Sequence, residues 1–534
     1  MIREIIVKLI EKAIKDLQKE KKLPGFKIPE ISVESSKEKS YGDYFLNIAL
    51  KLAKIVKKSP REIAENLKSQ ILNLKSDFFE KIEAVGGFIN FFVSKKYLQN
   101  QVGEILKQKE KFGNLKIGKN QKVNVEFISA NPTGPLTLGN GRGGFCGDVL
   151  AKALEKAGYQ TKKEYYINDT GEQIKKLGHS VLGDSQAVYA GKYINTLRES
   201  IRSKEAEKAG EEAAKIILEE MIKPTVKRMG IEFDFWFSEK SLYQKKEIDK
   251  VFTGLKKKKL TYESEGALWF KSTQFGDDKD RVLVKSDGEK TYFTSDIAYL
   301  KNKFKRGFKK LIFFWGADHF GYINRLKAAA EALGYKKEQL DIIVMQMVQL
   351  FQKGEEVKMS KRGGIYLTID ELIDEVGLDI VRFFFLTRGP GSHLIFDLDL
   401  AKEQSEKNPV YYVQYAYTRI HSILAKSKIK IQNSKLKFKI QNFKLLTHKS
   451  ELNLIKQLIR FPEIIEDTAK DYQVQRIPQY AADLATAFHQ FYGDCRVVNE
   501  DKNLSQARLG LILATKIVLK NTFDLMGIST PEKM

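Results

Sequence analysis

The sequence predicts an α/β protein, with an α+β region at the N-terminus and an all-α region at the C-terminus. Residues 121–158 contain a β-rich run, a turn and a glycine-marked helix, the pattern of a nucleotide-binding βα unit. Residues 1–115 mix helical periodicity with the strand-like segment FINFFV, and from residue 401 the pattern is helical to the end. We therefore divide the chain into residues 1–115, 116–400 and 401–534.

The first region is predicted to begin with a packed amphipathic helix. Apolar residues recur at helical spacing from Ile2 to Leu17. A basic helix on a membrane surface is the alternative, which is disfavoured because Glu4, Glu11 and Asp16 dilute the cationic face. Two further helices are predicted, over residues 47–56 and 60–72.

The βα unit forms the first half of a predicted nucleotide site. Its helix is expected to run from Gly141 to Gly158, so Gly139 lies at the helix entrance. A missing side chain there lets a base or phosphate approach the backbone, and unpaired N–H groups face an anion. Thr137 and Asn140 flank this glycine as neutral hydrogen-bond donors. An ordinary strand–loop–helix connection is the alternative for this segment taken alone.

The second half is the segment EEVKMSKRGG, in which Lys358 and Lys361 lie on a cationic stretch with glycines on both sides. Lysine is a compact point charge on a long stem, which suits it to phosphate oxygens as negative charge develops on a leaving pyrophosphate. A solvated charge run is the alternative in so basic a chain. The lysine cluster at residues 256–259 is assigned to that alternative, because it lacks a partner motif.

Length and composition indicate a multidomain globular protein with a polyanionic partner. A chain of 534 residues has room for roughly two to four domains, and 42% hydrophobic content favours packed cores over disorder. The formal net charge is +24 and the pI is about 9.5. Such a balance favours nucleic-acid binding, because clustered Lys and Arg release counterions from a phosphate backbone. A lysine-rich proteome is the alternative explanation of the charge.

Cysteine content and hydropathy are typical of an intracellular protein. Cys146 and Cys495 are the only cysteines, which excludes a disulfide framework and a four-cysteine zinc site and fits a reducing cytoplasm. No run of 18 apolar residues occurs, and the N-terminus lacks a secretory signal. We therefore expect a cytoplasmic protein with no membrane association and no zinc.

Two motifs carry a family resemblance. The segment SANPTGPLTLGNGRGG resembles the HIGH region, and VKMSKRGG the KMSK loop, of class I aminoacyl-tRNA synthetases, and the wider context resembles arginyl-tRNA synthetases. Further blocks match that family in order: GDYFLNIALKLAK, GGFINFFV, YYINDTGEQ, YFTSDIAY, FWGADHFGY, FDLDLA, NPVYYVQYA and TPEKM. The resemblance thus extends from the first region to the last residue. In one departure, Thr137 and Asn140 replace the two histidines of HIGH.

The resemblance implies the fold and role of each region. Residues 116–400 would form the class I catalytic domain, a doubly wound Rossmann-like parallel sheet with an insertion around residues 185–275. The sheet is expected to resume at residues 281–286 and 310–315. The first region would be the appended domain that contacts the outer corner of tRNA, and the last region the helical anticodon-binding bundle.

The implied reaction is arginine–tRNA ligation in two steps. The arginine carboxylate attacks the α-phosphorus of ATP, giving arginyl adenylate and pyrophosphate, and the terminal 2′-OH of tRNA(Arg) then takes the arginyl group. Mg²⁺ is expected to arrive with ATP. The residues implied to contact ATP are Pro132, Gly134, Thr137, Gly139, Asn140, Met359, Ser360 and Lys361. The implied catalytic residues are Thr137, Asn140, Lys358 and Lys361, the last as the main transition-state stabiliser.

The implied amino-acid pocket consists of Glu126, Asn131, Tyr292, Asp296 and His319. A planar guanidinium has five donors, and buried carboxylates are its best acceptors. Glu126 interrupts an apolar strand, which either a pocket charge or an exposed strand face explains. Asp296 follows the strand-like run TYFTS and has a helix N-cap as its alternative. His319 follows a strand end, and the adjacent Asp318 would hold the substrate amine or the ribose.

Contacts to tRNA rest on fewer signals. Asn47 is a candidate in the first region, with helix capping as its alternative, and Tyr415 is a candidate in the last, with core packing as its alternative. Residues 426–449 contain eight lysines and no acid, and we favour a surface insertion over an RNA-reading element. The resemblance implies a monomer. Two alternatives to the ligase are a tRNA-binding paralogue that does not aminoacylate, which TLGN motivates, and a class I synthetase for another amino acid.

Overall fold

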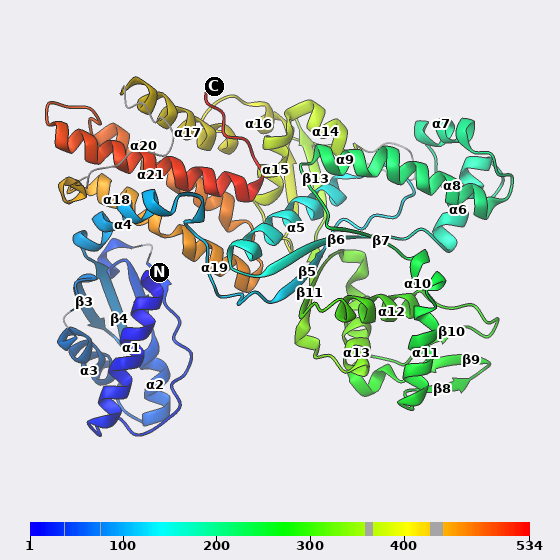
Figure 1. The fold of residues 1–534 in the computed structure, drawn as a ribbon, viewed down its shortest axis with the longest axis horizontal. Helices are drawn as coiled ribbons and strands as arrows, with labels where there is room; N and C mark the ends of the chain where they lie inside the picture. The colour runs from blue at the N-terminus through cyan, green and yellow to red at the C-terminus, as the bar shows by residue number, and fades with distance from the viewer. Residues whose placement is uncertain (37, 75, 358–366, 428–441) are drawn as a thin grey trace.

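The computed structural model describes residues 1–36, 38–74, 76–357, 367–427 and 442–534, and the predicted fold class is confirmed. Five parallel strands form the central sheet in the order β12-β11-β5-β6-β7. They are β5 (Lys122–Glu126), β6 (Gln160–Ile167), β7 (Phe235–Ser238), β11 (Lys310–Gly316) and β12 (Leu340–Met345). The strands run outward from β5 on one side and from β11 on the other, so the sheet is doubly wound and its order reverses between them (Figure 1). Ligands bind such sheets at the carboxyl ends of the strands beside this reversal.

Helices connect these parallel strands. α5 (Leu138–Lys156) joins β5 to β6, and α13 (Ile323–Leu333) joins β11 to β12. Between β6 and β7 a helical insertion extends to the right in Figure 1. It contains α6 (Glu172–Leu182), α7 (Lys192–Ser200), α8 (Ala206–Ile216) and α9 (Lys223–Arg228), with a π-helical turn between the last two. The first part of the predicted insertion around residues 185–275 thus contains α7, α8 and α9.

A second insertion, between β7 and β11, corrects two predictions. It contains α10 (Lys240–Gln244), α11 (Glu247–Lys257), α12 (Tyr292–Lys305) and an antiparallel sheet of β8 (Thr261–Ser264), β9 (Ala267–Phe270) and β10 (Arg281–Val284). The prediction that residues 281–286 resume the main sheet is wrong, because Val282 pairs with Trp269 of β9. The strand-like interpretation of TYFTS is also wrong, because Tyr292 begins α12. Tertiary packing outweighs the β-propensity of these residues.

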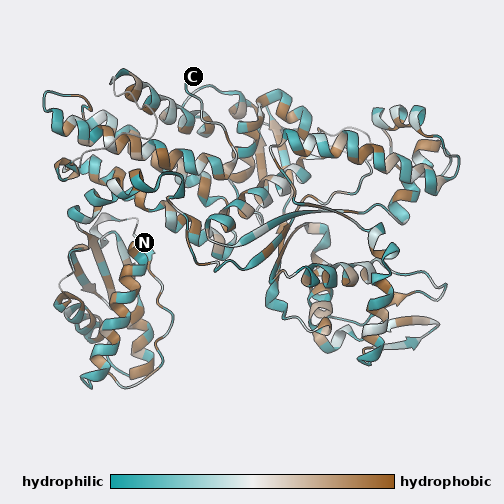
Figure 2. Cartoon of the chain, in the orientation of Figure 1, coloured by the Kyte–Doolittle hydropathy of each residue, from teal (hydrophilic) through white to brown (hydrophobic). Residues whose placement is uncertain are grey.

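The N-terminal region is an α+β unit, as predicted. Its antiparallel sheet has the order β1-β2-β4-β3. Its elements are α1 (Ile2–Lys19), β1 (Glu34–Ser35), β2 (Tyr44–Leu46), α2 (Ile48–Val56), α3 (Pro60–Asn73), β3 (Phe79–Val85), β4 (Phe88–Val93) and α4 (Lys95–Gln108). Ile6, Ile10 and Ile14 of α1 are fully buried, so this helix has no apolar face left for a membrane. Figure 2 shows the polar and apolar stripes of such helices in teal and brown.

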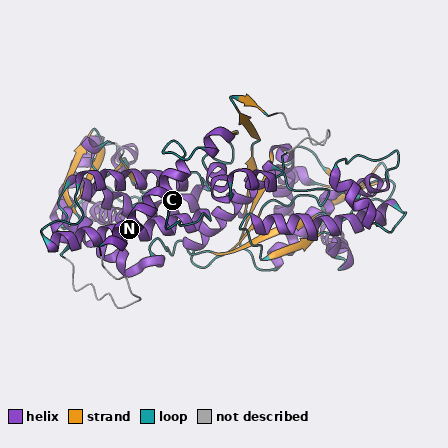
Figure 3. Ribbon diagram, turned by 90° about the horizontal axis from the view of Figure 1, so that it is seen from above, coloured by secondary structure: helices purple, strands orange, loops and turns teal. Residues whose placement is uncertain are grey.

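The C-terminal region is helical, as predicted. It comprises α17 (Pro409–Lys426), α18 (Lys449–Ile459), α19 (Phe461–Asp471), α20 (Arg476–Asp494) and α21 (Lys502–Met526). The segment before it holds β13 (Val348–Gln352), β14 (Glu355–Glu356), α14 (Ile369–Val376), α15 (Leu378–Leu386), β15 (Leu394–Asp397) and α16 (Leu398–Lys402). Seen from above, helices make up most of the molecule and the strands form small separate groups (Figure 3). Within the described ranges, no helix is both long enough and apolar enough to span a bilayer.

Candidate active site

Glu126 marks the active-site end of the sheet. It is the last residue of β5, beside the reversal of strand order, and only 6% of it is exposed. The alternative of an exposed strand face is therefore wrong. The Tyr299 hydroxyl donates to Glu126 Oε2 at 2.8 Å, and Lys303 Nζ lies 2.8 Å from the same oxygen. Two side chains of α12 thus already pair the Glu126 carboxylate.

Glu164 of β6 completes a buried polar network behind Glu126. Arg306 donates to both Glu164 oxygens, at 2.7 and 2.8 Å. The Tyr299 hydroxyl also lies 2.5 Å from Glu164 Oε1, so Glu126 and Glu164 share its single proton. Lys303 Nζ, which is fully buried, lies 3.2 Å away. Burial opposes the charge, but the cations outweigh it and lower the pKa of Glu164 to about 2. The network fixes the end of β5 and the middle of β6 against α12.

Asp296 is a half-buried acid on α12 with a different environment. The helix begins at Tyr292, so the alternative of an N-cap is wrong. Burial, followed by the negative charges of Glu239 and Glu126, raises the pKa of Asp296 to about 7, and Arg325 only partly offsets this. A bound cation would stabilise the ionised form of this carboxyl group strongly, because its main charged neighbours are negative.

Glu239 is a further acid of this cluster, and the sequence analysis missed it. It follows β7 directly and is 2% exposed. Burial raises its pKa, and hydrogen bonds from Ser295 and Tyr166 partly offset the rise. Burial first, and then the negative charges of Glu239, Asp296 and Glu126, raise the pKa of the Tyr166 phenol well above its usual value. Glu126, Glu239 and Asp296 therefore converge; we call them the acid cluster.

The other predicted pocket residues lie at the surface. Tyr292 is 48% exposed and precedes Asp296 by one turn of α12, so both side chains share a helix face. His319 is exposed in the 3-10 turn that follows β11, with its Nε2 3.5 Å from Asp318 Oδ2. Asn131 is exposed in the loop after β5. Each comes from an element that ends or begins at the reversal point of the sheet.

TLGN forms a capping box at the N-terminus of α5. The helix begins at Leu138, not at Gly141 as predicted, and Thr137 is its N-cap. The Thr137 N–H and Oγ1 donate to Asn140 Oδ1 at 3.0 and 2.9 Å, and the Asn140 N–H donates to Thr137 Oγ1 at 3.4 Å. The Asn140 Nδ2 group and the N–H groups of Leu138 and Gly139 make no hydrogen bond to any other described residue and can donate to a ligand.

The loop between β5 and α5 is strained and covered. Ile128 and Ser129 have φ values of 65° and 39°, a left-handed conformation that non-glycine residues rarely adopt and that clusters at functional sites. Pro132 and Gly134 are buried. A Cβ on Gly134 would lie 3.1 Å from the hydroxyl of Tyr193 on α7, which donates to the preceding carbonyl at 2.9 Å. The helical insertion therefore covers the predicted ATP loop.

The predicted residues Lys358, Met359, Ser360 and Lys361 lie outside the described residues. The chain that follows them is described and approaches TLGN. Thr368 forms an isolated antiparallel bridge with Thr137, and the Ile369 N–H donates to the Leu136 carbonyl at 3.0 Å. The residues soon after KMSKRGG are thus hydrogen-bonded to the entrance of α5.

Comparison with known proteins decides the family. Models of the arginyl tRNA synthetase N-terminal domain, the class I (R) tRNA synthetase catalytic domain and the DALR anticodon-binding domain match in this order. They cover residues 4–93, then 101–212 and 184–381, then 413–534. Arginine–tRNA ligase 1 of Halalkalibacterium halodurans is 45% identical over 531 residues, 95% of each chain. The chain belongs to the arginyl-tRNA synthetase family.

Further comparisons agree with this family. The arginine–tRNA ligase of Caldanaerobacter subterraneus subsp. tengcongensis is 44% identical over 559 residues, 100% of this chain and 99% of that one. The solved structure of Thermus thermophilus arginyl-tRNA synthetase has a TM-score of 0.77 over 100% of both chains, at 21% identity, which shows a shared fold. Membership of this class I family implies ATP as a substrate. It also removes the alternative of a synthetase for another amino acid.

Of the two predicted tRNA contacts, Tyr415 has the clearer setting. On α17 its partly exposed ring stacks with Tyr411, at 6.2 Å between centroids and 9° between planes, and with His489 at 6.0 Å. The Arg419 guanidinium lies 4.6 Å from the same ring. The ring is thus partly packed against its neighbours and partly accessible, so packing and tRNA contact both stay as interpretations of Tyr415. Asn47 holds the N-cap position of α2, but its side chain makes no capping hydrogen bond.

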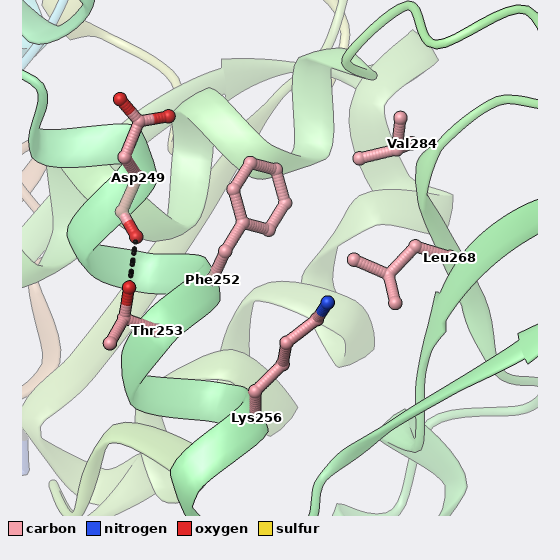
Figure 4. A pocket seen from close by; sticks show the side chains of 6 residues that line it. All are labelled: Asp249, Phe252, Thr253, Lys256, Leu268 and Val284. Atoms are coloured by element: carbon pink, nitrogen blue, oxygen red, sulfur yellow. Dashed lines mark hydrogen bonds between the residues drawn. The ribbon is translucent and has the colours of Figure 1, made fainter.

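A surface hollow of about 450 Å³ lies away from the acid cluster. Its walls come from α11, β9 and β10: Asp249, Phe252, Thr253, Lys256, Leu268 and Val284 (Figure 4). None of these residues belongs to β5, α5 or α12, so the hollow is not the candidate active site. Among the described residues, no group of three His, Cys, Asp or Glu side chains is placed to ligate a metal ion.

Proposed function

We propose that this chain is an active arginine–tRNA ligase whose amino-acid pocket is the acid cluster. The observation that supports this best is the convergence of Glu126, Glu239 and Asp296 at the reversal point of the sheet. Lys303 pairs Glu126, whereas Asp296 lacks such a partner among the described side chains. A guanidinium is always charged and planar, so it matches a half-buried carboxylate that no cation pairs and that lies beside other acids.

The exposed pocket residues orient the rest of arginine. Tyr292 shares the helix face of Asp296 and contacts the substrate side chain at the mouth of the cluster. His319 and Asn131 follow neighbouring strands, where they reach the α-amino and carboxylate groups. Asp318 holds the α-amino group or the ATP ribose. The carboxylate that reacts is thereby directed toward α5.

ATP lies at the N-terminus of α5 in this proposal. Gly139 leaves room for the nucleotide, and the Asn140 Nδ2 group with the helix N–H groups donates to it. Pro132 and Gly134 shape the loop beside it. The bridge between Thr368 and Thr137 supports a role for the preceding segment at the phosphates. Those phosphate contacts are assigned to Lys358, Met359, Ser360 and Lys361.

The chemistry requires no protein nucleophile. The arginine carboxylate is already anionic, so it attacks the α-phosphorus once it is aligned, and pyrophosphate leaves. Lys361 and Lys358 stabilise the charge that develops on the leaving group, with Mg²⁺ arriving on ATP and no zinc taking part. The terminal 2′-OH of tRNA(Arg) then attacks the adenylate carbonyl, and AMP leaves.

The tRNA spans several regions of the chain. Tyr415 and its neighbouring rings offer a stacking surface beside a cation for anticodon bases. Asn47 contacts the tRNA from the N-terminal region. We further assign the protein to the cytoplasm, as a monomer.

A charging assay tests the proposal. Labelled arginine, ATP and tRNA(Arg) are incubated with the protein, and acid-precipitable label is counted, with lysine and glutamate as control amino acids. Arginine alone is expected to be transferred. Tight tRNA binding without transfer would instead establish the paralogue that does not aminoacylate, which the TLGN departure motivates.

A further inference from the structure

Arg382 of α15 is a fully buried guanidinium that joins three parts of the molecule. Its Nε donates at 2.7 Å to the Met526 carbonyl, where α21 of the C-terminal bundle ends. Its Nη1 donates at 2.6 Å to the Met229 carbonyl, where α9 of the helical insertion ends. Its Nη2 donates at 2.5 Å to Asp148 Oδ2, on the α5 helix that TLGN begins. Figure 1 shows α21 and α9 reaching this centre from opposite sides.

We call Arg382 and its three acceptors, the Met526 carbonyl, the Met229 carbonyl and Asp148, the joint. Only an arginine side chain can make these three hydrogen bonds. The last carbonyls of a helix lack intrahelical partners and carry the negative end of the helix dipole. The rigid guanidinium fork offers separate N–H groups to two such helix ends and to a carboxylate at once. A lysine carries its three donors on a single nitrogen, so it cannot reach acceptors as widely spaced as those of the guanidinium fork.

Asp148 is held firmly within the joint. Besides Arg382, Lys152 Nζ lies 2.9 Å and Lys163 Nζ 3.1 Å from its oxygens. Burial opposes its charge, but Arg382 and the two lysines outweigh burial and lower the pKa of Asp148 to about 2. The Asp148 carboxylate is therefore ionised at physiological pH, so a change of pH near 7 does not alter its hydrogen bond with Arg382. A movement of Arg382 would alter that bond.

Gly527 shows how closely α21 approaches the joint. It ends that helix with φ at 67°, and a Cβ at this position would lie 2.5 Å from Arg382 Nη2 and 2.6 Å from its Cζ. A side chain on Gly527 would therefore displace the guanidinium from the bundle side. This offers a way to disturb the joint without touching α5.

We propose that Arg382 is a positioning residue through which the docking of the C-terminal bundle sets the ATP-binding end of α5. Because α5 is one continuous helix from Thr137 past Asp148, a shift of Asp148 is transmitted to Gly139. Arg382 itself touches no substrate. The inference rests on the proposed ligation of arginine to tRNA, since the bundle is the part that binds the anticodon.

The test compares two RNA substrates by kcat/KM: full-length tRNA(Arg), and a minihelix with only the acceptor stem and its terminal CCA. We expect the unaltered protein to prefer full-length tRNA, because only that substrate can engage the bundle. Arg382→Lys and Gly527→Ala are each expected to reduce this preference about tenfold through kcat, with KM for arginine nearly unchanged. The double variant is expected to lose no more than the stronger single variant, because both act on one joint.

Controls separate coupling from general destabilisation. Arg281→Lys weakens another buried pair, with Asp277 at 2.8 Å, and is expected to lower Tm without changing the preference. Asp148→Asn, which keeps the shape of the acceptor, serves if either first variant fails to fold. An equal loss on both RNAs, or an unchanged preference in folded variants, overturns the inference. No charging of either RNA by the unaltered protein overturns the proposed function instead.

Discussion

The carboxyl groups of the acid cluster differ in their charged neighbours: Glu126 lies beside a cation, whereas Asp296 lies mainly beside other acids. Glu126 has Lys303 at 2.8 Å, so its charge is paired before any substrate arrives. Asp296 has the acids Glu239 and Glu126 as its main charged neighbours, and its pKa is raised to about 7. The difference lies in the neighbours and not in the carboxyl groups themselves. Arginine binding should therefore depend on the ionisation of Asp296.

We expect kcat/KM for arginine to rise with pH through about 7. Below this pH Asp296 is protonated and cannot attract a guanidinium, whereas above it the carboxylate is anionic. One ionisation permits a change of about tenfold per pH unit on the acid side. Exchange of ATP with labelled pyrophosphate, measured with tRNA present at varied arginine, gives the profile. A flat profile between pH 6 and pH 8 would remove Asp296 from the pocket.

Asp296→Asn should separate activity from stability. Loss of the charged acceptor is expected to lower kcat/KM for arginine. The loss of transition-state stabilisation should be about 2–5 kcal/mol. Because the folded pKa is raised from 3.8 to about 7, stability falls as pH rises between these two values, so the neutral amide should raise Tm more at pH 8 than at pH 5. Asp249→Asn, on the exposed face of α11, is the matched control and should change neither quantity.

Part of the acid cluster could be predicted from the sequence. Glu126 and Asp296 stand within blocks that resemble the family, and Glu126 also interrupts an apolar strand. Glu239 was missed, although an acid directly after the strand-like run FWFS was an available signal. Nothing local indicates that Lys303, on an amphipathic helix, is fully buried between two acids of other strands. Such pairing is a property of the tertiary fold.

Among the elements, α5 shows how TLGN serves a position that histidines hold in the family pattern. Thr137 and Asn140 satisfy each other in the capping box, so the helix entrance is ordered by the motif itself. A protonated imidazole is absent, yet the helix N-terminus and the Asn140 amide still supply neutral donors. If ATP binds there, as proposed, the cap links helix stability to ATP binding.

Thr137→Val should test that link. Valine keeps the shape but removes the capping hydroxyl, so we expect a loss of about 1 kcal/mol in unfolding free energy and a lower kcat in pyrophosphate exchange. Thr137→Ser keeps the cap and should retain both. Ser94→Ala removes the equivalent cap of α4, where Ser94 accepts from the Tyr97 N–H, and should cost similar stability without affecting exchange. An unaltered kcat for Thr137→Val would refute the link.

The glycines of α5 explain why its start was predicted too late. Glycine lowers helix propensity, so the run after Thr137 suggested a longer turn. The structure shows that the glycines permit close packing: a Cβ on Gly141 would lie 2.5 Å from Ile369, and one on Gly147 would lie 2.3 Å from Phe127. Both neighbours come from other elements. Sequence periodicity can predict that a helix exists. It cannot predict on which face the helix needs glycines so that its neighbours can pack against the backbone.

Across the whole molecule, the order and fold type of the three regions could be predicted, because hydrophobic periodicity changes along the chain. The contacts between regions could not. Arg3 and Tyr44 of the N-terminal region both reach Glu463 of α19, at 3.3 and 2.9 Å, across more than 400 residues of sequence. The Arg382 joint is a second example. Side chains of ordinary local appearance meet only once the regions have packed.

The affinity of the whole molecule for tRNA should have two contributions. Salt screens the attraction between charges, whereas it does not weaken the stacking of bases on aromatic rings. The net charge of +24 predicts that affinity for tRNA falls steeply with ionic strength. Tyr415→Ala removes one ring of the stack and no charge. We therefore expect weaker binding, by about 1–3 kcal/mol of binding free energy, at every salt concentration. The slope of log Kd against log salt should stay unaltered. Arg419→Gln should instead reduce that slope by about one. Filter binding of tRNA(Arg) at several salt concentrations measures both, with Tyr335→Ala as the control, since that ring stacks on Phe304 outside the bundle. If Tyr415→Ala left Kd unchanged at all salt concentrations, Tyr415 would have no part in tRNA binding.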